Sequence, residues 1–221
     1  NTTADNNVAI GRLALTANTT GTGNTSIGAA TMQVNTTASN NTAVGLSALA
    51  VNAAGSGNTA VGAIALDANT SGVSNTAVGY ASLTANTTGT LNVAMGVNAL
   101  AASTTGNNNT AIGTLALGAN TTADANTAVG SYALNANTTG TVNTAVGRLA
   151  LFANTTGSYN TAIGHISGDA ITTGESNTAL GYGSGSGITT SDNNTTIGGS
   201  CAATLSTGAG NTILGASAAN S

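Results

Sequence analysis

Apolar and polar residues alternate in a pattern that returns every 17 residues along the chain. The string Asn-Thr-Ala-Val-Gly begins at Asn41, Asn58, Asn75, Asn126 and Asn143, at spacings that are all multiples of 17. In this register the 221 residues form thirteen repeats without insertion or deletion, since 221 is thirteen times 17. The idealised repeat is N-T-T-G-x-x-N-T-A-V-G-x-x-A-L-x-A, and we number its positions 1 to 17. Position 7 is always Asn, position 10 always aliphatic and position 11 always Gly.

A repeat of this length predicts a stack of similar coils. Seventeen residues are too few for a helical hairpin repeat, and Thr, Asn and Gly are poor helix formers. Asn-Thr-Ala-Val closed by Gly predicts a short strand that ends in a bend. Positions 13 to 17, running into the next Asn-Thr-Thr, predict a second extended segment. We therefore expect an all-β fold, a parallel β-solenoid (β-roll) of thirteen 17-residue coils, each with two or three short strands.

Two apolar positions of the repeat predict the core. Position 10 is always aliphatic, and position 15 is Leu or Met in the first nine repeats, so both are expected to point inward. Ala at positions 14 and 17 is expected to fill the remaining space. The predicted core residues in the regular repeats are Val44, Leu49, Val61, Leu66, Val78, Leu83, Ile112, Leu117, Val129, Leu134, Val146 and Leu151.

Position 9 then points to the other face, because successive residues of a strand alternate between faces. It is Ala in ten repeats and otherwise Ser26, Thr196 and Ile213, although an exposed face would accept larger polar side chains. Another sheet of the same coil, a neighbouring chain or merely the crowded corners of a curved coil could account for this; we favour a neighbouring chain. The predicted packing face comprises Ala43, Ala60, Ala77, Ala94 and Ala111.

The polar positions predict ladders along the stack. Asn at positions 1 and 7 and Thr at positions 2, 3 and 8 recur in most repeats, and stacked amides hydrogen-bond from one coil to the next. Identical charges stacked in the same way would repel one another, so a scarcity of charge is expected. The residues predicted to form the ladder and the turn after the strand are Asn41, Gly45, Asn58, Gly62, Asn75, Gly79, Asn126 and Gly130.

The last repeats depart from the pattern at two positions together. Position 15 loses its Leu and position 1 loses its Asn. The replacements are Gly168, Gly185, Ala202 and Ala219 at position 15, and Ile171, Ile188 and Leu205 at position 1. One apolar position is exchanged for another, so we expect a single solenoid domain over 1–221, with regular coils in 1–165 and modified coils in 166–221.

Charge and composition exclude several classes of protein. The net charge is −4, and Arg12 and Arg148 are the only permanent cations, so binding of nucleic acid through its phosphates is not expected. No run of 18 apolar residues is long enough to predict a membrane-spanning helix. All eight charged residues fall at positions 5, 12 and 16, which we predict to face solvent.

The sequence predicts no catalytic residue, no cofactor and no metal site. An enzyme needs converging titratable groups, whereas this chain has one His, one Cys and six scattered acidic residues. His165 is expected to be a lone surface residue, and Cys201 replaces the Ala of position 14 and is expected to be buried. Asn-x-Ser/Thr triplets, such as those at Asn18 and Asn86, match the N-glycosylation pattern, so glycans on Asn or Thr are a candidate modification, although the repeat itself generates these triplets.

The Asn-Thr-Ala-Val-Gly and Ala-Leu-x-Ala-Asn-Thr-Thr-Gly segments resemble, over the whole chain, two kinds of repeat protein. One is the head repeat of YadA-like trimeric autotransporter adhesins, and the other is the tandem repeat of bacterial and phage tail-fibre-like proteins. The resemblance implies a parallel β-roll in which three chains pack together. It also implies an extracellular or cell-surface protein of bacterial origin.

We therefore expect a structural extracellular fibre protein without catalytic activity, whose copies self-assemble end to end or laterally into a rod or filament. Two alternatives stay open. The chain is also compatible with the shaft or head segment of a trimeric adhesin or tail fibre. An ice-binding solenoid is the third hypothesis, but it needs two parallel Thr rows on one face, and Thr at adjacent positions 2 and 3 face opposite ways.

Overall fold

The computed structural model describes residues 4–205 and 207–219, in which every coil contributes one three-residue strand at positions 8 to 10. The chain divides into two compact units, one ending at Asn109 and the other beginning at Thr110. The first unit contains β1 (Val8–Ile10), β2 (Thr25–Ile27), β3 (Thr42–Val44), β4 (Thr59–Val61), β5 (Thr76–Val78) and β6 (Val93–Met95). The second contains β7 (Thr110–Ile112), β8 (Thr127–Val129), β9 (Thr144–Val146), β10 (Thr161–Ile163), β11 (Thr178–Leu180), β12 (Thr195–Ile197) and β13 (Thr212–Leu214). Within these described residues there is no helix that could cross a membrane.

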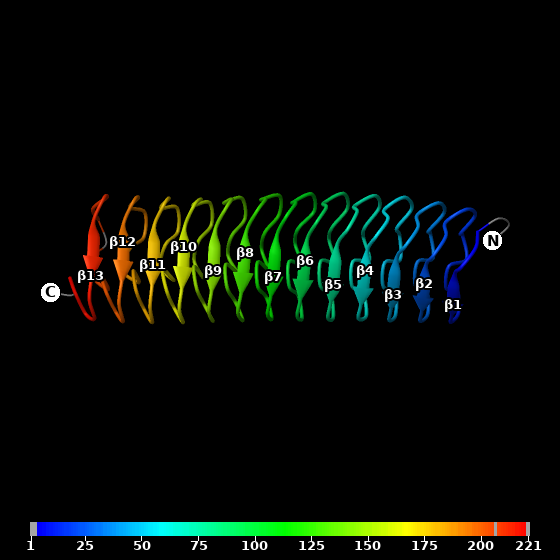
Figure 1. Cartoon of the computed structure of the whole chain (residues 1–221), viewed down its shortest axis with the longest axis horizontal. Helices are drawn as coiled ribbons and strands as arrows, with labels where there is room; N and C mark the ends of the chain where they lie inside the picture. The colour runs from blue at the N-terminus through cyan, green and yellow to red at the C-terminus, as the bar shows by residue number, and fades with distance from the viewer. Residues whose placement is uncertain (1–3, 206, 220–221) are drawn as a thin grey trace. The chain divides into compact units, whose positions relative to one another are not determined.

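Successive strands of each unit lie side by side and pair in parallel (Figure 1). The register advances by one repeat at each step, so that Thr42 pairs with Thr59 and Val44 pairs with Val61. Each position of the repeat is consequently stacked on the same position of the next coil. The predicted all-β, parallel β-solenoid class is confirmed.

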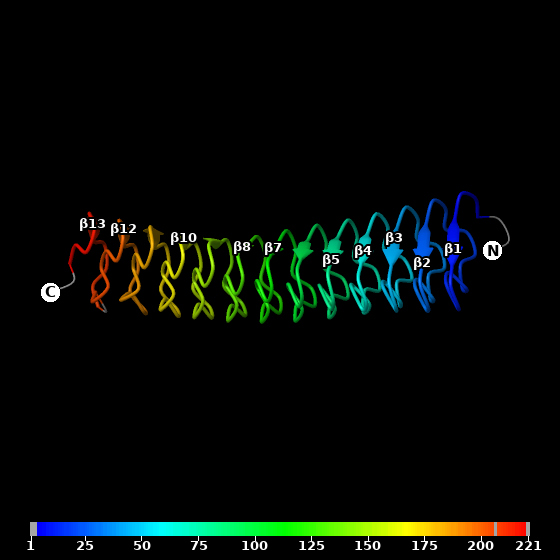
Figure 2. The same cartoon turned by 90° about the horizontal axis from the view of Figure 1, so that it is seen from below.

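The predicted second extended segment is wrong. Positions 12 to 17 form turns, because the residues at positions 13 and 15 have left-handed backbone conformations, as at Leu149 (φ 60°) and Leu151 (φ 50°). A left-handed residue at every second position bends the chain before three extended residues can follow one another. The turns are nevertheless bonded between coils, since the N–H of Leu151 donates to the carbonyl of Ser167 at 3.0 Å. The strands therefore lie along one side of each unit, with the turns and loops on the other (Figure 2).

Glycine at position 11 is required by the close approach of successive coils. Gly45 has a φ of 133°, and a Cβ atom built on it would lie 2.6 Å from the carbonyl oxygen of Gly62 in the next coil. Both the conformation and the missing space exclude an L-residue with a side chain. This explains why the sequence places Gly at the end of each strand.

The core contains the leucines of position 15, as the sequence predicted. Leu49, Leu66, Leu83, Leu117, Leu134 and Leu151 have no exposed surface. The Ala residues of position 14, such as Ala48 and Ala133, are equally buried. Apolar burial in the regular coils thus rests on one large side chain in each coil.

The predicted direction of the strand side chains is wrong at two positions. Position 10 points outward: Val44, Val61, Val78 and Val129 are half-exposed, and Ile112 and Val146 are exposed. Position 9 points inward, and Ala43, Ala60, Ala77, Ala94 and Ala111 are completely buried within the coils of their own chain instead of forming an outer packing face. The reason is space: the coil interior already holds the position-15 leucine and two Asn side chains, so only a small residue fits beneath the strand.

Candidate functional site

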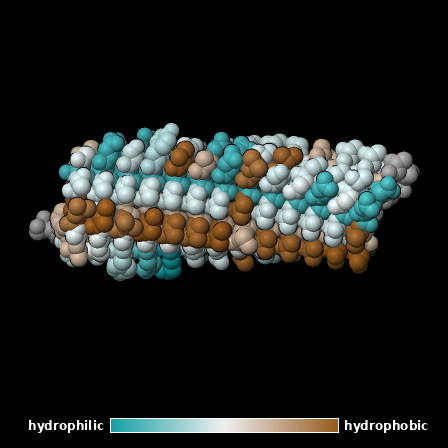
Figure 3. Space-filling view, in the orientation of Figure 1, coloured by the Kyte–Doolittle hydropathy of each residue, from teal (hydrophilic) through white to brown (hydrophobic). Residues whose placement is uncertain are grey.

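The outward position-10 side chains form a continuous apolar row on the strand side of each unit, which we call the aliphatic row. In the second unit it consists of the position-10 residues of β7 to β13, from Ile112 to Leu214. Val129 is half-exposed, whereas Leu180 exposes 42% of its surface and Leu214 exposes 64%. Figure 3 shows this row as a band of apolar surface along the strands of each unit.

The strand geometry places the row and keeps it free of charge. Positions 8 and 10 share the outer face because they are two residues apart, so a row of mostly Thr residues runs beside the aliphatic row. The parallel register stacks Ile112 on Val129 and Val129 on Val146. The charged residues of the sequence occupy positions 5, 12 and 16, outside the strand. The outer strand face is therefore a neutral surface of methyl and hydroxyl groups.

Behind the strands, the Asn residues of position 7 form the first of two buried ladders. The backbone N–H of Asn58 donates to Oδ1 of Asn41 at 2.8 Å, and the Asn41 Nδ2 donates to the carbonyl of Gly55 at 3.0 Å. The same bonds recur through the second unit, as from Asn143 N–H to Asn126 Oδ1 at 2.9 Å. Asn41, Asn58, Asn75 and Asn126 are completely buried. Each side chain thus satisfies backbone groups on neighbouring coils that no strand partner reaches.

The Asn residues of position 1 form the second ladder through their side chains. The Asn52 Nδ2 donates both to Asn35 Oδ1 at 3.2 Å and to the carbonyl of Gly55 at 2.8 Å. The Gly55 carbonyl therefore accepts from Asn41 and Asn52 together, which joins the two ladders at position 4. This cross-linking of amides holds the coil cross-section constant from one repeat to the next.

The position-1 ladder is interrupted where the sequence lacks Asn at that position. Ser103 follows Asn86 by one repeat, and Ile171 follows Asn154 by one repeat. Oδ1 of Asn86, Oδ1 of Asn154 and Oγ of Ser103 are buried without a hydrogen-bond partner in the described part of the chain. The unpaired amide oxygens therefore mark the two interruptions.

The titratable residues are scattered over the described coils. His165 is exposed, and its ring lies 5.6 Å from that of Tyr182. Asp169 is half-buried, with Oδ1 enclosed and unpaired. Burial raises the pKa of the Asp169 carboxyl above its ordinary value of 3.8, against the opposing effects of the Asp169 and Ala170 N–H groups and of His165. Within the described residues no three His, Cys, Asp or Glu side chains are placed to hold a metal ion.

The other side chains considered from the sequence lie inside the coils. Cys201 is buried as a free thiol. Asn18 and Asn86, the first residues of two glycosylation triplets, are also buried. Their Nδ2 atoms donate to the carbonyls of Gly21 and Gly89, so in the folded chain these two amides are not presented for attachment of a glycan.

No family model, curated protein or solved structure matches the chain. Sequence reasoning missed that the aliphatic row faces outward, although one signal was present. A position restricted to Ala in ten of thirteen repeats is typical of a tight interior, whereas position 10 varies in size from Val to Met as a less confined surface allows.

Proposed function

We propose that the chain is a non-catalytic structural protein of an extracellular, bacterial fibre, and that copies of it pack side by side through the aliphatic row. The observation that carries the proposal is that a chain with so few large apolar residues presents one of them outward from nearly every coil. Contiguous exposed apolar surface is typical of protein–protein contacts. The extracellular and bacterial assignments rest on the resemblance of the repeats.

The size of the row decides how copies meet. Strands stack about 4.8 Å apart, so the seven strands of the second unit make a row about 30 Å long. With a width of roughly 10 Å it offers about 300 Å², whereas a stable interface usually buries about 800 Å² on each partner. The Thr row at position 8 and the corner residues beside the strand must therefore join the contact. The position-8 side chains are small and uncharged, which allows close approach along the strands.

The test replaces the row without touching the core. Val129→Lys, Val146→Lys and Ile163→Lys, combined in one variant, introduce charges on three adjacent strands of the second unit. The control combines Thr122→Lys, Thr139→Lys and Thr156→Lys, which add the same charges at the exposed position 3 of the same coils. Circular dichroism establishes that both variants fold.

Sedimentation and electron microscopy then measure assembly. We expect the parent and the control to form multi-chain particles or filaments and the row variant to stay monomeric. A parent that is monomeric at millimolar concentration, or a control that loses assembly as completely as the row variant, contradicts the proposal. Three chains in each cross-section would favour the trimeric adhesin or tail-fibre alternative.

Ice binding is a second candidate because of the outer strand face. Thr42 and Val44, and their equivalents in other coils, form two parallel rows on the same face, a geometry that Thr at positions 2 and 3 does not provide. Regular rows of hydroxyl and methyl groups, repeated about every 4.8 Å, are suited to ordering water. Thermal hysteresis in the parent that disappears in the Val129, Val146 and Ile163 variant supports this candidate, and its absence in the parent removes it.

A further inference from the structure

One corner of the second unit carries large polar or aromatic side chains on three successive coils. Position 12 is small or aliphatic in most coils, but three successive coils place Arg148, His165 and Tyr182 there. All three are exposed, and Tyr182 exposes 59% of its surface. We call them the position-12 cluster. Because a uniform stack needs no such residues, their adjacency calls for an explanation beyond folding.

Stacking of equivalent positions brings the three side chains into contact. The carbonyl of Arg148 accepts from Ile166 N–H at 3.0 Å, and that of His165 accepts from Gly183 N–H at 3.1 Å, which holds the three corners in line. Arg148 Nη1 lies 3.1 Å from His165 Nε2. The His165 and Tyr182 rings are 5.6 Å apart and inclined at 43°. Guanidinium, imidazole and phenol thus form one short row across β9, β10 and β11.

The side chains of this row present hydrogen-bond donors, which favour an anion as the ligand. A guanidinium only donates, so His165 Nε2 accepts from Arg148 and the proton of the neutral imidazole resides on Nδ1. The remaining Arg148 N–H groups, His165 Nδ1–H and the Tyr182 hydroxyl are then available as donors. No carboxylate forms an ion pair with Arg148 among the residues that the structure describes.

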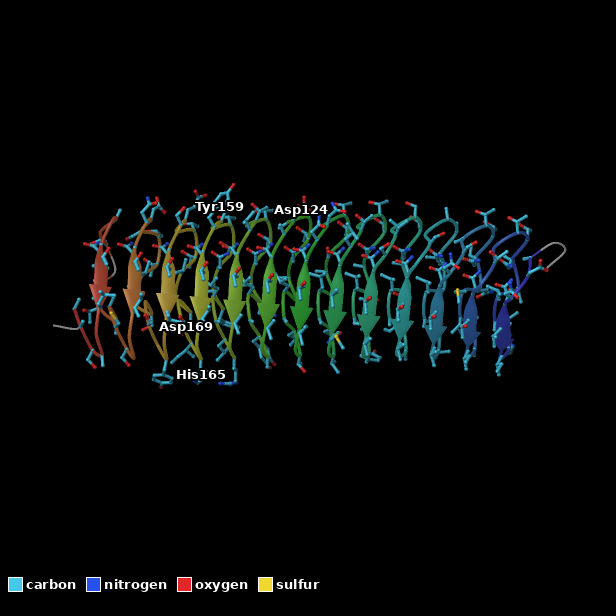
Figure 4. All side chains as sticks on the ribbon, in the orientation of Figure 1. Asp124, Tyr159, His165 and Asp169 are labelled. Atoms are coloured by element: carbon cyan, nitrogen blue, oxygen red, sulfur yellow. The ribbon has the colours of Figure 1, made fainter. Side chains whose placement is uncertain are left out.

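The acidic groups of the second unit lie at different distances from the cluster. Asp169 lies four residues beyond His165 and is half-buried, and Figure 4 shows it between the His165 edge and the opposite edge. Asp124, which occupies position 5, lies at that opposite edge together with Tyr159 (Figure 4). Glu175 and Asp192 share position 5 with Asp124. The position-5 acidic residues therefore lie at a different corner of the coil from the cluster, and Asp169 is the acidic residue that interacts with it, through His165.

The combination of hydrogen-bond donors and an aromatic ring limits the kinds of anion that the cluster could bind. A planar carboxylate suits the forked guanidinium better than a spherical ion does. The exposed Tyr182 ring adds an apolar surface on which the C–H face of a sugar ring packs. The cluster contains one of only two permanent cations in an acidic chain, which is too little positive charge to bind nucleic acid. We propose that Arg148, His165 and Tyr182 bind the carboxylate-bearing sugar of an acidic polysaccharide, with His165 orienting the guanidinium.

The test measures binding of oligogalacturonate to the full chain by calorimetry. Arg148→Gln removes the charge, and Tyr182→Ala removes the ring. Arg12→Gln is the matched control, because Arg12 occupies the same repeat position and is exposed, with Ala29 instead of an aromatic ring in the following coil. We expect Arg148→Gln to weaken binding by at least about tenfold, as for loss of a charge-assisted hydrogen bond. Tyr182→Ala should weaken it several-fold, and Arg12→Gln should leave it unchanged.

Three comparison ligands complete the design. A neutral galactose oligomer of the same length should not bind, which isolates the carboxylate. Sulfated oligosaccharide and inorganic phosphate report whether any anion suffices. Equal binding of phosphate or of the sulfated oligosaccharide, equal binding of the neutral oligomer, equal weakening by Arg12→Gln, or absence of oligogalacturonate binding would each overturn the proposal. The measurement is independent of self-assembly, because the aliphatic row is unchanged in every variant.

Discussion

Two kinds of coil within the second unit solve the same packing problem differently. In the coils of β8 and β9, Leu134 and Leu151 fill the interior from position 15, and Asn137 and Asn154, each at position 1 of the following repeat, extend the position-1 ladder. In the next two coils position 15 is Gly168 and Gly185, and the interior is filled from position 1 of the following repeat.

In the modified coils the apolar side chain at position 1 takes the space that the position-15 leucine fills in the regular coils. Ile171 and Ile188 are buried, and a Cβ atom on Gly168 would lie 3.1 Å from Ile171 Cδ1. The isoleucine therefore occupies space next to the glycine that a larger position-15 side chain would need. The cost is a broken ladder, because Asn154 Oδ1 has no donor in the following coil. Apolar volume is kept while an amide hydrogen bond is lost.

The largest expected loss of stability follows replacement of the position-11 glycine, which both kinds of coil share. Gly130→Ala should destabilise the protein by about 3 kcal/mol or more, because φ is 140° and the new Cβ would lie 2.5 Å from the Gly147 carbonyl oxygen. Gly199→Ala is the control, since nothing lies within 4 Å of a Cβ there and its φ is outside the left-handed range. Denaturant unfolding measures both, and equal stability of the two variants would remove the close-stacking explanation.

A double-mutant cycle tests the exchange itself. Gly168→Leu overfills the modified coil, and Ile171→Asn leaves it underfilled, so each single variant should lose about 2 kcal/mol. The double variant restores the regular pattern, with an amide that reaches Asn154 Oδ1, and should recover most of the loss. The unfolding free energies of the four proteins give the coupling. Additive losses would show that the two positions do not share one space.

The third prediction repairs the other interruption of the ladder. Ser103→Asn supplies an Nδ2 donor one repeat after Asn86, whose Oδ1 is buried and unpaired. We expect stabilisation by about 1 kcal/mol, the usual net value of a hydrogen bond. Asn86→Ala measured in both backgrounds is the control, because its cost should be greater once residue 103 is Asn. An unchanged cost means that the new amide does not join the ladder.

The smallest effect is expected at Asp169, in the first modified coil. Burial raises the pKa of its carboxyl, so the folded state binds a proton more tightly than the unfolded state. This contribution to stability is complete below pH 3.8 and is lost as the pH rises through the folded-state pKa. Asp169→Asn should consequently raise the Tm by about 1–2 °C at pH 7 and leave it unchanged at pH 3. Calorimetry at the two pH values tests this, and an equal shift at both would point to a cause other than ionisation.

Much of this comparison was predictable from residue spacing. The joint replacement of Leu by Gly168 and of Asn by Ile171 indicates an exchange of apolar positions from the sequence alone. The buried role of Leu134 and the Asn ladders followed from the repeat in the same way. The direction of Val129 did not, because alternation along a strand separates two faces without saying which is inside. The shared repeat position of Arg148, His165 and Tyr182 places them on neighbouring coils, but their side-chain contacts depend on the tertiary structure.

The sequence by itself determined the 17-residue period and the stacking of equivalent residues, because a repeat without insertions places each residue on the equivalent residue of the next coil. The scarcity of charge follows, since stacked identical charges would repel one another. Only the tertiary structure decided which strand face is inside. The left-handed turns at positions 13 and 15 bring Leu151 and the Asn side chains beneath the strand and leave room there for nothing larger than alanine or a similarly small residue in the regular coils. That constraint turns the aliphatic residues outward and gives the protein the surface through which we propose it assembles.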